Sequence, residues 1–223
     1  GGYVSNYSTG YQTYATADTW RYDTQTNQWT AFVPLPAARS AGAMVIIGDE
    51  LHYFDGNDIN RNGTADHWVL NLSDANPQWV ASAPVPVASN HIAAAVLDGK
   101  IYAIGGQTGN DDSQPDADVF EWDPANPGDW QAVASLPAPI SHAVAVTVGN
   151  QILLIDGVTT GLVQLASVLS YDPTTNTWST LSNPLPAPRE YPAADLIDNR
   201  IVVTTGDYYG LRAETWVSQP IAP

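Results

Sequence analysis

The stretch Ile101-Tyr102-Ala103-Ile104-Gly105-Gly106 decides the fold class of this 223-residue chain. It is short, apolar and rich in β-branched and aromatic residues, and it ends at a glycine pair, which is typical of a buried β-strand that stops at a turn. A second apolar stretch, residues 92–97, precedes it across the turn Asp98-Gly99-Lys100. The two stretches together predict an antiparallel pair of strands.

The same unit recurs about every fifty residues. A glycine ends an apolar strand at positions 56, 106, 157 and 206, and a tryptophan begins another strand at 29, 79, 130 and 178. A third series with the same period consists of Trp20, Trp68, Phe120, Leu169 and Trp216. Three series with one period indicate a repeat architecture.

Each period contains four predicted strands. The first strands are 41–47, 92–97, 143–148 and 193–197, and the second strands are 51–54, 101–104, 152–155 and 201–205. A third strand, such as 168–171, leads to the fourth, which begins at the tryptophan and ends in a proline-rich link such as Pro34-Leu35-Pro36. No stretch keeps a 3.6-residue apolar period, so we expect few helices. Four antiparallel strands in fifty residues match one blade of a β-propeller.

The unit resembles the kelch repeat. The resemblance rests on residues 101–106, followed by the aromatic-Asp pair Trp122-Asp123 and then Trp130; Tyr22-Asp23 with Trp29 and Tyr171-Asp172 with Trp178 repeat its second half. The glycine pair is kept at 1–2 and 105–106, and it is replaced by Asp55-Gly56, Asp156-Gly157 and Thr205-Gly206 elsewhere. The resemblance implies an all-β, kelch-type β-propeller. It leaves function open, because such propellers include both binding scaffolds and enzymes.

The phase of the repeat predicts three complete blades, 37–86, 87–138 and 139–188, and two partial ones, 1–36 and 189–223. The terminal strands could pair to close a ring of four blades, with one third strand left over. Kelch-like rings usually have six or seven blades, so we expect a longer chain or an oligomer to complete the propeller. Within each blade we expect a positive φ at the glycine that ends the second strand, and tryptophans packed in the core.

The composition limits the partners. The chain has 7 Lys+Arg against 23 Asp+Glu, a formal net charge of −16 and no cysteine. The charge argues against binding to nucleic acid or to an anionic membrane surface, and no apolar run of about 18 residues predicts membrane insertion. The lack of cysteine excludes disulfides, thiolate metal sites and thiol nucleophiles. An acidic surface rich in uncharged polar residues favours an extracellular, secreted or cell-surface location over the alternative, an acidic cytosolic protein.

The loop from Asp58 to Asp66 predicts a calcium site. Its pattern D-x-N-x-N-G-x-x-D resembles the calcium loops of integrin-type propellers and dockerin-like repeats. The expected ligands are Asp58, Asn60, Asn62, the Thr64 carbonyl and Asp66. Two carboxylates predict weak binding, suited to extracellular calcium. The alternative interpretation is a polar turn without a metal. Asn6, Asn62 and Asn71 begin glycosylation sequons.

His91 and His142 stand 51 residues apart, in register with Ala41 and Tyr191, where each first strand begins. These positions are either structural features of the repeat or part of a ligand site at the mouth of the propeller channel. The residues of that candidate site are Arg39, His91, His142, Arg189, Glu190 and Tyr191. Two histidines alone are too few ligands for a typical metal centre.

No sequence motif establishes an enzyme. The chain contains no G-x-S-x-G, H-E-x-x-H or P-loop motif. The copper radical oxidases that use kelch-like propellers need a cysteine, which this chain lacks. We therefore expect a non-catalytic extracellular recognition or structural module that presents its loops to a protein or glycan partner and is stabilised by calcium. The alternatives are a sugar-active enzyme or lectin that uses the channel mouth, and a structural subunit of an extracellular assembly joined through open blade edges.

Overall fold

The structure of the protein, a computed structural model, describes residues 1–6, 10–109, 114–207 and 210–221. The regular secondary structure in these ranges consists of β-strands alone. Three of the sheets have four antiparallel strands in chain order. Their strands are β5 (Ala43–Ile47), β6 (Glu50–Phe54), β7 (His67–Asn71) and β8 (Trp79–Ala81); β9 (Ala93–Leu97), β10 (Lys100–Ile104), β11 (Val119–Trp122) and β12 (Trp130–Ala132); and β13 (Val144–Val148), β14 (Gln151–Ile155), β17 (Val168–Asp172) and β18 (Thr177–Thr180).

Two smaller sheets flank these three blades. One pairs β3 (Trp20–Asp23) with β4 (Gln28–Ala31), and the other contains β19 (Ala193–Ile197), β20 (Arg200–Thr204) and β21 (Thr215–Val217). Two hairpins stand apart from the blades: β1 (Val4–Asn6) with β2 (Tyr11–Thr13), and β15 (Val158–Thr159) with β16 (Val163–Gln164). The predicted all-β propeller built from four-stranded blades is confirmed.

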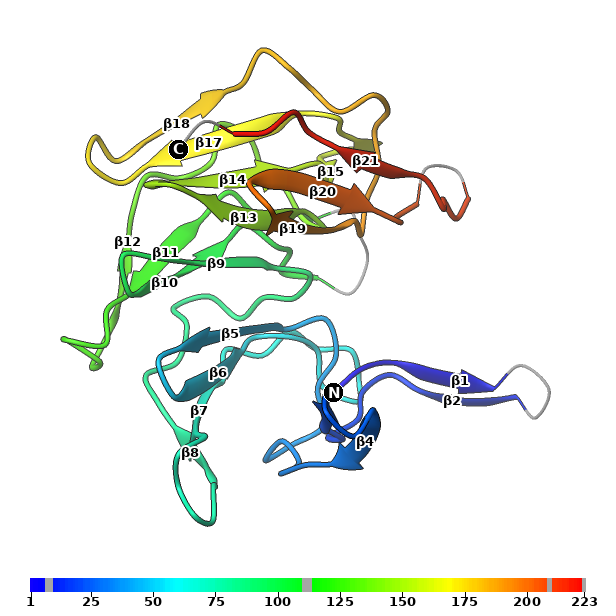
Figure 1. The fold of residues 1–223 in the computed structure, drawn as a ribbon, viewed down its shortest axis with the longest axis vertical. Coiled ribbons are helices and arrows are strands. Elements are labelled where there is room, and N and C mark those ends of the chain that lie inside the picture. Colours follow the sequence, from blue (N-terminus) through cyan, green and yellow to red (C-terminus); the bar gives the residue numbers. More distant parts are fainter. Residues whose placement is uncertain (7–9, 110–113, 208–209, 222–223) are drawn as a thin grey trace.

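The blades follow one another along the chain and pack face to face (Figure 1). Their first strands β5, β9, β13 and β19 are neighbours in this order. Apolar side chains of adjacent sheets fill the seams: Phe54 of one blade packs in a cluster with Ile101 and Trp130 of the next. The hairpin of β1 and β2 projects from the body as an arm (Figure 1).

Repeated hydrogen bonds fasten each blade to the next. The N–H of the glycine that ends a second strand donates to a carbonyl in the following link; the pairs are Gly2 with Arg39 (2.8 Å), Gly56 with Ser89 (2.9 Å), Gly106 with Ile140 (2.9 Å) and Gly157 with Arg189 (3.1 Å). The indole N–H of the fourth-strand tryptophan donates to the link of the preceding blade; the pairs are Trp79 with Val33, Trp130 with Ala83 and Trp178 with Ala134. The fifty-residue period is therefore also a period of contacts between blades.

Gly56 shows why a glycine is needed where a second strand ends. Its φ is +97°, and a Cβ built on it would lie 2.6 Å from the backbone oxygen of Ser40. Both the dihedral angle and the close approach exclude a side chain. The positive φ predicted at this point of the repeat is present at residues 56, 106, 157 and 206.

The structure differs from the sequence prediction in two details. Each second strand begins one residue earlier than predicted, because turns such as Asp98-Gly99 contain two residues, both with positive φ, and leave Lys100 paired with Leu97. The prediction of core tryptophans is wrong for Trp20 and Trp29. They are 62% and 65% exposed because their sheet has two strands only, whereas Trp130 of a complete blade is 5% exposed.

Candidate functional site

The residue that precedes each first strand occupies the same place in four successive repeats. Ala41, His91, His142 and Tyr191 all have a positive φ, between 51° and 60°. Backbone hydrogen bonds connect them in sequence: His91 N–H donates to Ala41 O (2.8 Å), His142 N–H to His91 O (3.0 Å), and Tyr191 N–H to His142 O (3.0 Å). A left-handed conformation is uncommon for such residues, and clusters of such strain occur at functional sites.

This arrangement gathers three rings. The centroids of His91 and His142 are 4.2 Å apart, and Tyr191 stands edge-on to both, at 5.7 Å from His91 and 4.3 Å from His142. Half of the residues predicted at the channel mouth are therefore brought together. Burial, with a further contribution from His91, lowers the pKa of His142 to about 3. His142 is accordingly neutral at physiological pH.

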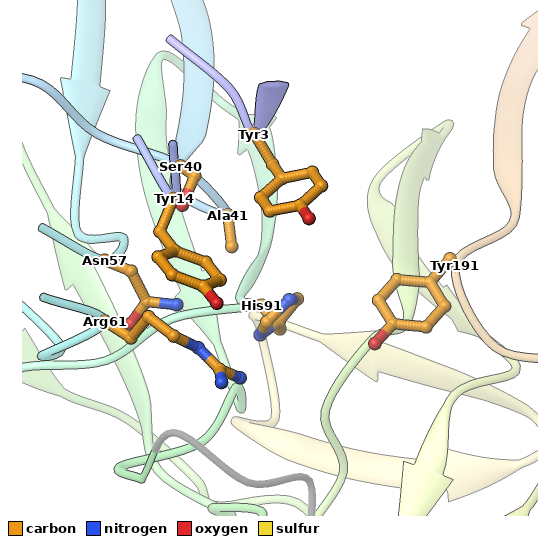
Figure 2. Close-up of a pocket in the computed structure, with 8 residues that line it drawn as sticks. All are labelled: Tyr3, Tyr14, Ser40, Ala41, Asn57, Arg61, His91 and Tyr191. Atoms are coloured by element: carbon orange, nitrogen blue, oxygen red, sulfur yellow. The ribbon is translucent and has the colours of Figure 1, made fainter. Parts of the chain in front are cut away.

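A hollow of about 540 Å³ opens beside these rings, and we call it the mouth pocket. Its lining consists of Tyr3, Tyr14, Ser40, Ala41, Asn57, Arg61, His91 and Tyr191. Figure 2 shows Tyr14 and Arg61 on one side, Tyr191 on the opposite side and His91 between them. Tyr3 and Tyr14 come from the two ends of the projecting hairpin, with ring centroids 5.7 Å apart. The Arg61 guanidinium lies over the Tyr14 ring at 5.3 Å.

The lining has a distinctive charge. Among the described residues, the lining includes Arg61 and no aspartate or glutamate, although the chain is strongly acidic. Aromatic faces supply apolar area, while Arg61, Asn57 and Ser40 supply hydrogen-bond donors. The pocket is thus suited to a ligand with a planar or apolar group and at least one hydrogen-bond acceptor.

The other residues predicted at the mouth lie outside this lining. Arg39 is buried, forms an ion pair with Asp66 and covers the Trp68 ring at 5.0 Å. Arg189 is also buried, donates to the carbonyl of Thr205 and lies 3.7 Å from the Trp216 ring centroid. Both arginines therefore contact strands and loops of the blade that each of them precedes. The Glu190 carboxylate accepts a hydrogen bond from Gln164 Nε2 at 2.7 Å.

Sequence reasoning missed Tyr3, Tyr14 and Asn57 of the pocket lining and placed Arg61 only in the calcium loop. Tyr3 and Tyr14 belong to a hairpin that is not part of the repeat, and Asn57 and Arg61 belong to the loop that follows a second strand. The topology of the blades could have indicated Asn57 and Arg61. The loops that follow the second strands emerge where the first strands begin, as the backbone pairing of Ser40 with Asn57 shows.

Two buried carboxylates were also missed. Asp55 and Asp156 replace the first glycine of the kelch pair, with φ of 58° and 61° and almost no exposed surface. Neither carboxylate has a hydrogen-bond partner among the described residues. Burial raises the pKa of Asp156 to about 8, opposed by Arg189, and burial together with Asp66 raises the pKa of Asp55 well above its usual value. Asp156 is therefore predominantly protonated near neutral pH.

His52 and His67 form a separate buried pair, with Nδ1 of His52 3.0 Å from Nε2 of His67. Both rings pack against Trp122. Burial lowers the pKa of each to about 4, so both are neutral within the core. We therefore assign both histidines a role in packing the core.

The predicted calcium loop closes on itself through Asp58. Its Oδ1 accepts the backbone N–H groups of Asn60 (2.8 Å) and Asn62 (2.9 Å), and its Oδ2 accepts from the Asn62 side chain (3.2 Å). The Thr64 carbonyl accepts a bond from Ser89 N–H, and Asp66 pairs with Arg39. Among the described residues, no three His, Asp or Glu side chains are grouped to hold a metal. Calcium binding stays a prediction.

The predicted glycosylation sites differ in setting. Asn62 is exposed but bonded to Asp58, and Asn71 ends β7 and accepts a bond from Ser73 N–H at 2.9 Å. Asn6 ends β1, and the remainder of its sequon, residues 7 and 8, lies outside the described residues.

The fold and the repeat contacts define a kelch-type propeller, and the comparisons agree. The chain belongs to the kelch-repeat family, because the model described as the KLHDC2/KLHL20/DRC7 Kelch-repeats domain matches residues 1–206. A solved structure entitled "Structure of YjhT" aligns with a TM-score of 0.73 at 19% identity, over 85% of this chain and 66% of the other. At that identity the likeness concerns the fold alone.

The search of curated proteins found no match. Kelch propellers generally mediate protein interactions. Within the ranges that the structure describes, no helix is long and apolar enough to cross a bilayer.

Proposed function

We propose that this protein is a non-catalytic recognition module that binds a segment of a partner protein in the mouth pocket. The observation that carries the proposal is the lining itself. Three tyrosines, His91 and Arg61 converge on one hollow, and its described lining contains no carboxylate. Tyrosine and arginine are the residue types that contribute most to binding free energy at protein interfaces.

The dimensions and rigidity of the site support a peptide ligand. A hollow of about 540 Å³ accommodates one or two side chains and the adjoining backbone. The repeat-wide backbone bonds of Ala41, His91, His142 and Tyr191 hold the floor in place. A rigid floor reduces the entropy lost when a ligand binds.

Selection from a displayed peptide library tests the proposal. Peptides retained by the wild-type protein should bind Tyr14→Ala about tenfold more weakly, because this change removes the ring that faces Arg61. The matched control is Tyr22→Ala, which removes an exposed tyrosine on β3 outside the pocket and should leave affinity unchanged. The proposal fails if no peptide is retained, or if the retained peptides bind both variants equally.

A glycan is the second candidate ligand, as for a lectin or a sugar-active enzyme at the channel mouth. Tyrosine faces also stack on sugar rings, and Tyr3 and Tyr14 present such faces. A glycan array probed with wild-type protein and Tyr14→Ala distinguishes the two ligands. Binding of glycans that depends on Tyr14, without any selected peptide, would favour this alternative.

An extracellular location, calcium stabilisation and association with further strands belong to the same proposal. The location is supported by the acidic composition rich in uncharged polar residues, and calcium by the loop 58–66. Completion of the propeller by an oligomer or a longer chain is supported by the two-stranded sheet of β3 and β4, which exposes Trp20 and Trp29. Open strand edges favour such pairing.

A further inference from the structure

Asn57 occupies a position that recurs in four repeats. One residue follows the glycine that ends each second strand, and these residues are Asn57, Gln107, Val158 and Asp207. Each exchanges two backbone hydrogen bonds with the segment that leads into the first strand of its blade. In the first of these repeats, Asn57 N–H donates to Ser40 O (2.7 Å) and Ser40 N–H donates to Asn57 O (3.0 Å). The repeat therefore fixes the backbone at residue 57.

The side-chain amide of Asn57 is buried and incompletely paired. The residue is 7% exposed, and its Oδ1 accepts no hydrogen bond from the residues that the structure describes. Two counterparts have a local explanation: Val158 is buried and apolar, and Asp207 Oδ1 accepts the Gly210 N–H at 2.8 Å. A buried amide without such a partner costs free energy, so its presence indicates a role other than stabilising the fold.

This amide faces the mouth pocket. Asn57 belongs to the lining, and Figure 2 shows its amide nitrogen pointing toward the hollow between Tyr14 and His91, whereas its oxygen points away. The orientation agrees with the general behaviour of buried amide groups, in which an unpaired N–H is rarer than an unpaired oxygen. The hydrogens of Nδ2 are thus presented to a ligand.

We infer that Asn57 anchors the main chain of the bound segment, with its Nδ2 donating a hydrogen bond to a backbone carbonyl of the peptide. Every residue of a peptide carries such a carbonyl, whatever its side chain. The bond therefore fixes where the segment lies, while the aromatic rings of the lining contact its side chains. The nature of the ligand rests on the proposed function, and the inference adds the residue and the atom that hold it.

The anchor is rigid before the ligand arrives. Besides the two bonds between Asn57 and Ser40, the carbonyl of Gly56 accepts both the N–H (2.8 Å) and the hydroxyl (2.9 Å) of Thr64. The peptide group that enters residue 57 is thus held from both sides. Binding through Asn57 orders few additional torsions, which limits the entropy lost on association.

Asn57→Val separates a binding role from a structural one. The repeat itself has valine at this position in Val158, with the same backbone pairing, so the variant should fold. Since it removes an incompletely paired buried amide, its melting temperature should rise by about 2 °C. Its affinity for a peptide selected as described above should fall about tenfold. A lower melting temperature, or an affinity equal to that of the wild type, would overturn the inference.

Two further variants control this result. Asn150 lies in the exposed turn between β13 and β14, so Asn150→Val makes the same replacement away from the pocket and should leave affinity unchanged. Asn57→Asp keeps the size of the side chain but replaces the donor by an acceptor, so it should weaken binding at least about tenfold at pH 8. Equal or tighter binding by Asn57→Asp would mean that the ligand presents a donor, and would contradict the inference.

A thioamide scan of the selected peptide identifies the carbonyl. Sulfur accepts hydrogen bonds less well than oxygen, so one thioamide position should weaken binding to the wild-type protein but not to Asn57→Val. If no position behaves in this way while binding still depends on Tyr14, the inference is wrong and the proposed function stands. Binding that is independent of Tyr14 would instead contradict the proposed function.

Discussion

At the scale of single residues, left-handed backbone conformations carry much of this structure. They occur at the glycines that end the second strands, at Asp55 and Asp156 beside them, and at His91, His142 and Tyr191 at the mouth. At a glycine the conformation allows close approach of the next link. At the mouth the same conformation turns a ring toward its neighbours in the adjacent repeats.

Gly56→Ala should destabilise the fold by about 3 kcal/mol, because a Cβ combines a disfavoured φ with contact against backbone atoms of residues 40 and 42. Gly99→Ala is the matched control. Gly99 also has a positive φ but open space around a built Cβ, so the loss should be about 1 kcal/mol. Urea unfolding of both variants measures the difference, and equal losses would show that the close approach is unimportant.

Asp156→Asn should stabilise the protein at pH 8 by about 1 kcal/mol or more. The folded-state pKa is raised from 3.8 to about 8 by burial, so stability is lost as the pH rises through this window. The variant should therefore show a flatter profile of unfolding free energy against pH. Asp172→Asn is the opposing control: a hydrogen bond from Thr174 lowers the pKa of Asp172, so its contribution is lost as the pH falls.

At the scale of elements, local patterns predicted the strands better than the site. Apolar runs and turn residues located the strands of the complete blades, and the apolar signal is clearest in the second strands β6, β10 and β14, because these are largely buried. The exposure of Trp20 and Trp29 was not predictable from the same pattern, since it depends on how many strands their sheet contains. The mouth pocket joins residues 41, 91 and 191, which occupy one position of the repeat, with residues 3, 14 and 61, which come from a hairpin and a loop.

The loop 58–66 makes an element-scale prediction about calcium. If it binds the ion, calcium should raise the melting temperature of the wild-type protein, and Asp58→Ala with Asp66→Ala should remove that gain. The gain, and not the melting temperature itself, is the measurement, because Asp66 also pairs with Arg39 and Asp58 caps its own turn. A gain that persists in the double variant, or no gain in the wild type, would contradict the prediction.

At the scale of the whole molecule, the propeller converts a linear repeat into a convergent site. Each repeat places one residue at the start of its first strand, and the backbone bonds across the seams bring those residues to one end of the molecule. The hairpin of β1 and β2 adds tyrosines that no repeat encodes. In the proposed function, the repeat therefore supplies the rigidity of the site and the inserted loops supply its specificity.

The most direct test of the central claim is to map the bound peptide by NMR. On addition of a selected peptide, amide shifts should change at residues 3, 14, 61, 91 and 191, which line the mouth pocket. The turn Asp98-Gly99, which lies at the far end of the hairpin formed by β9 and β10, should not respond. Shifts confined to that turn and its counterparts in the other blades would contradict the assignment of the mouth pocket as the recognition site.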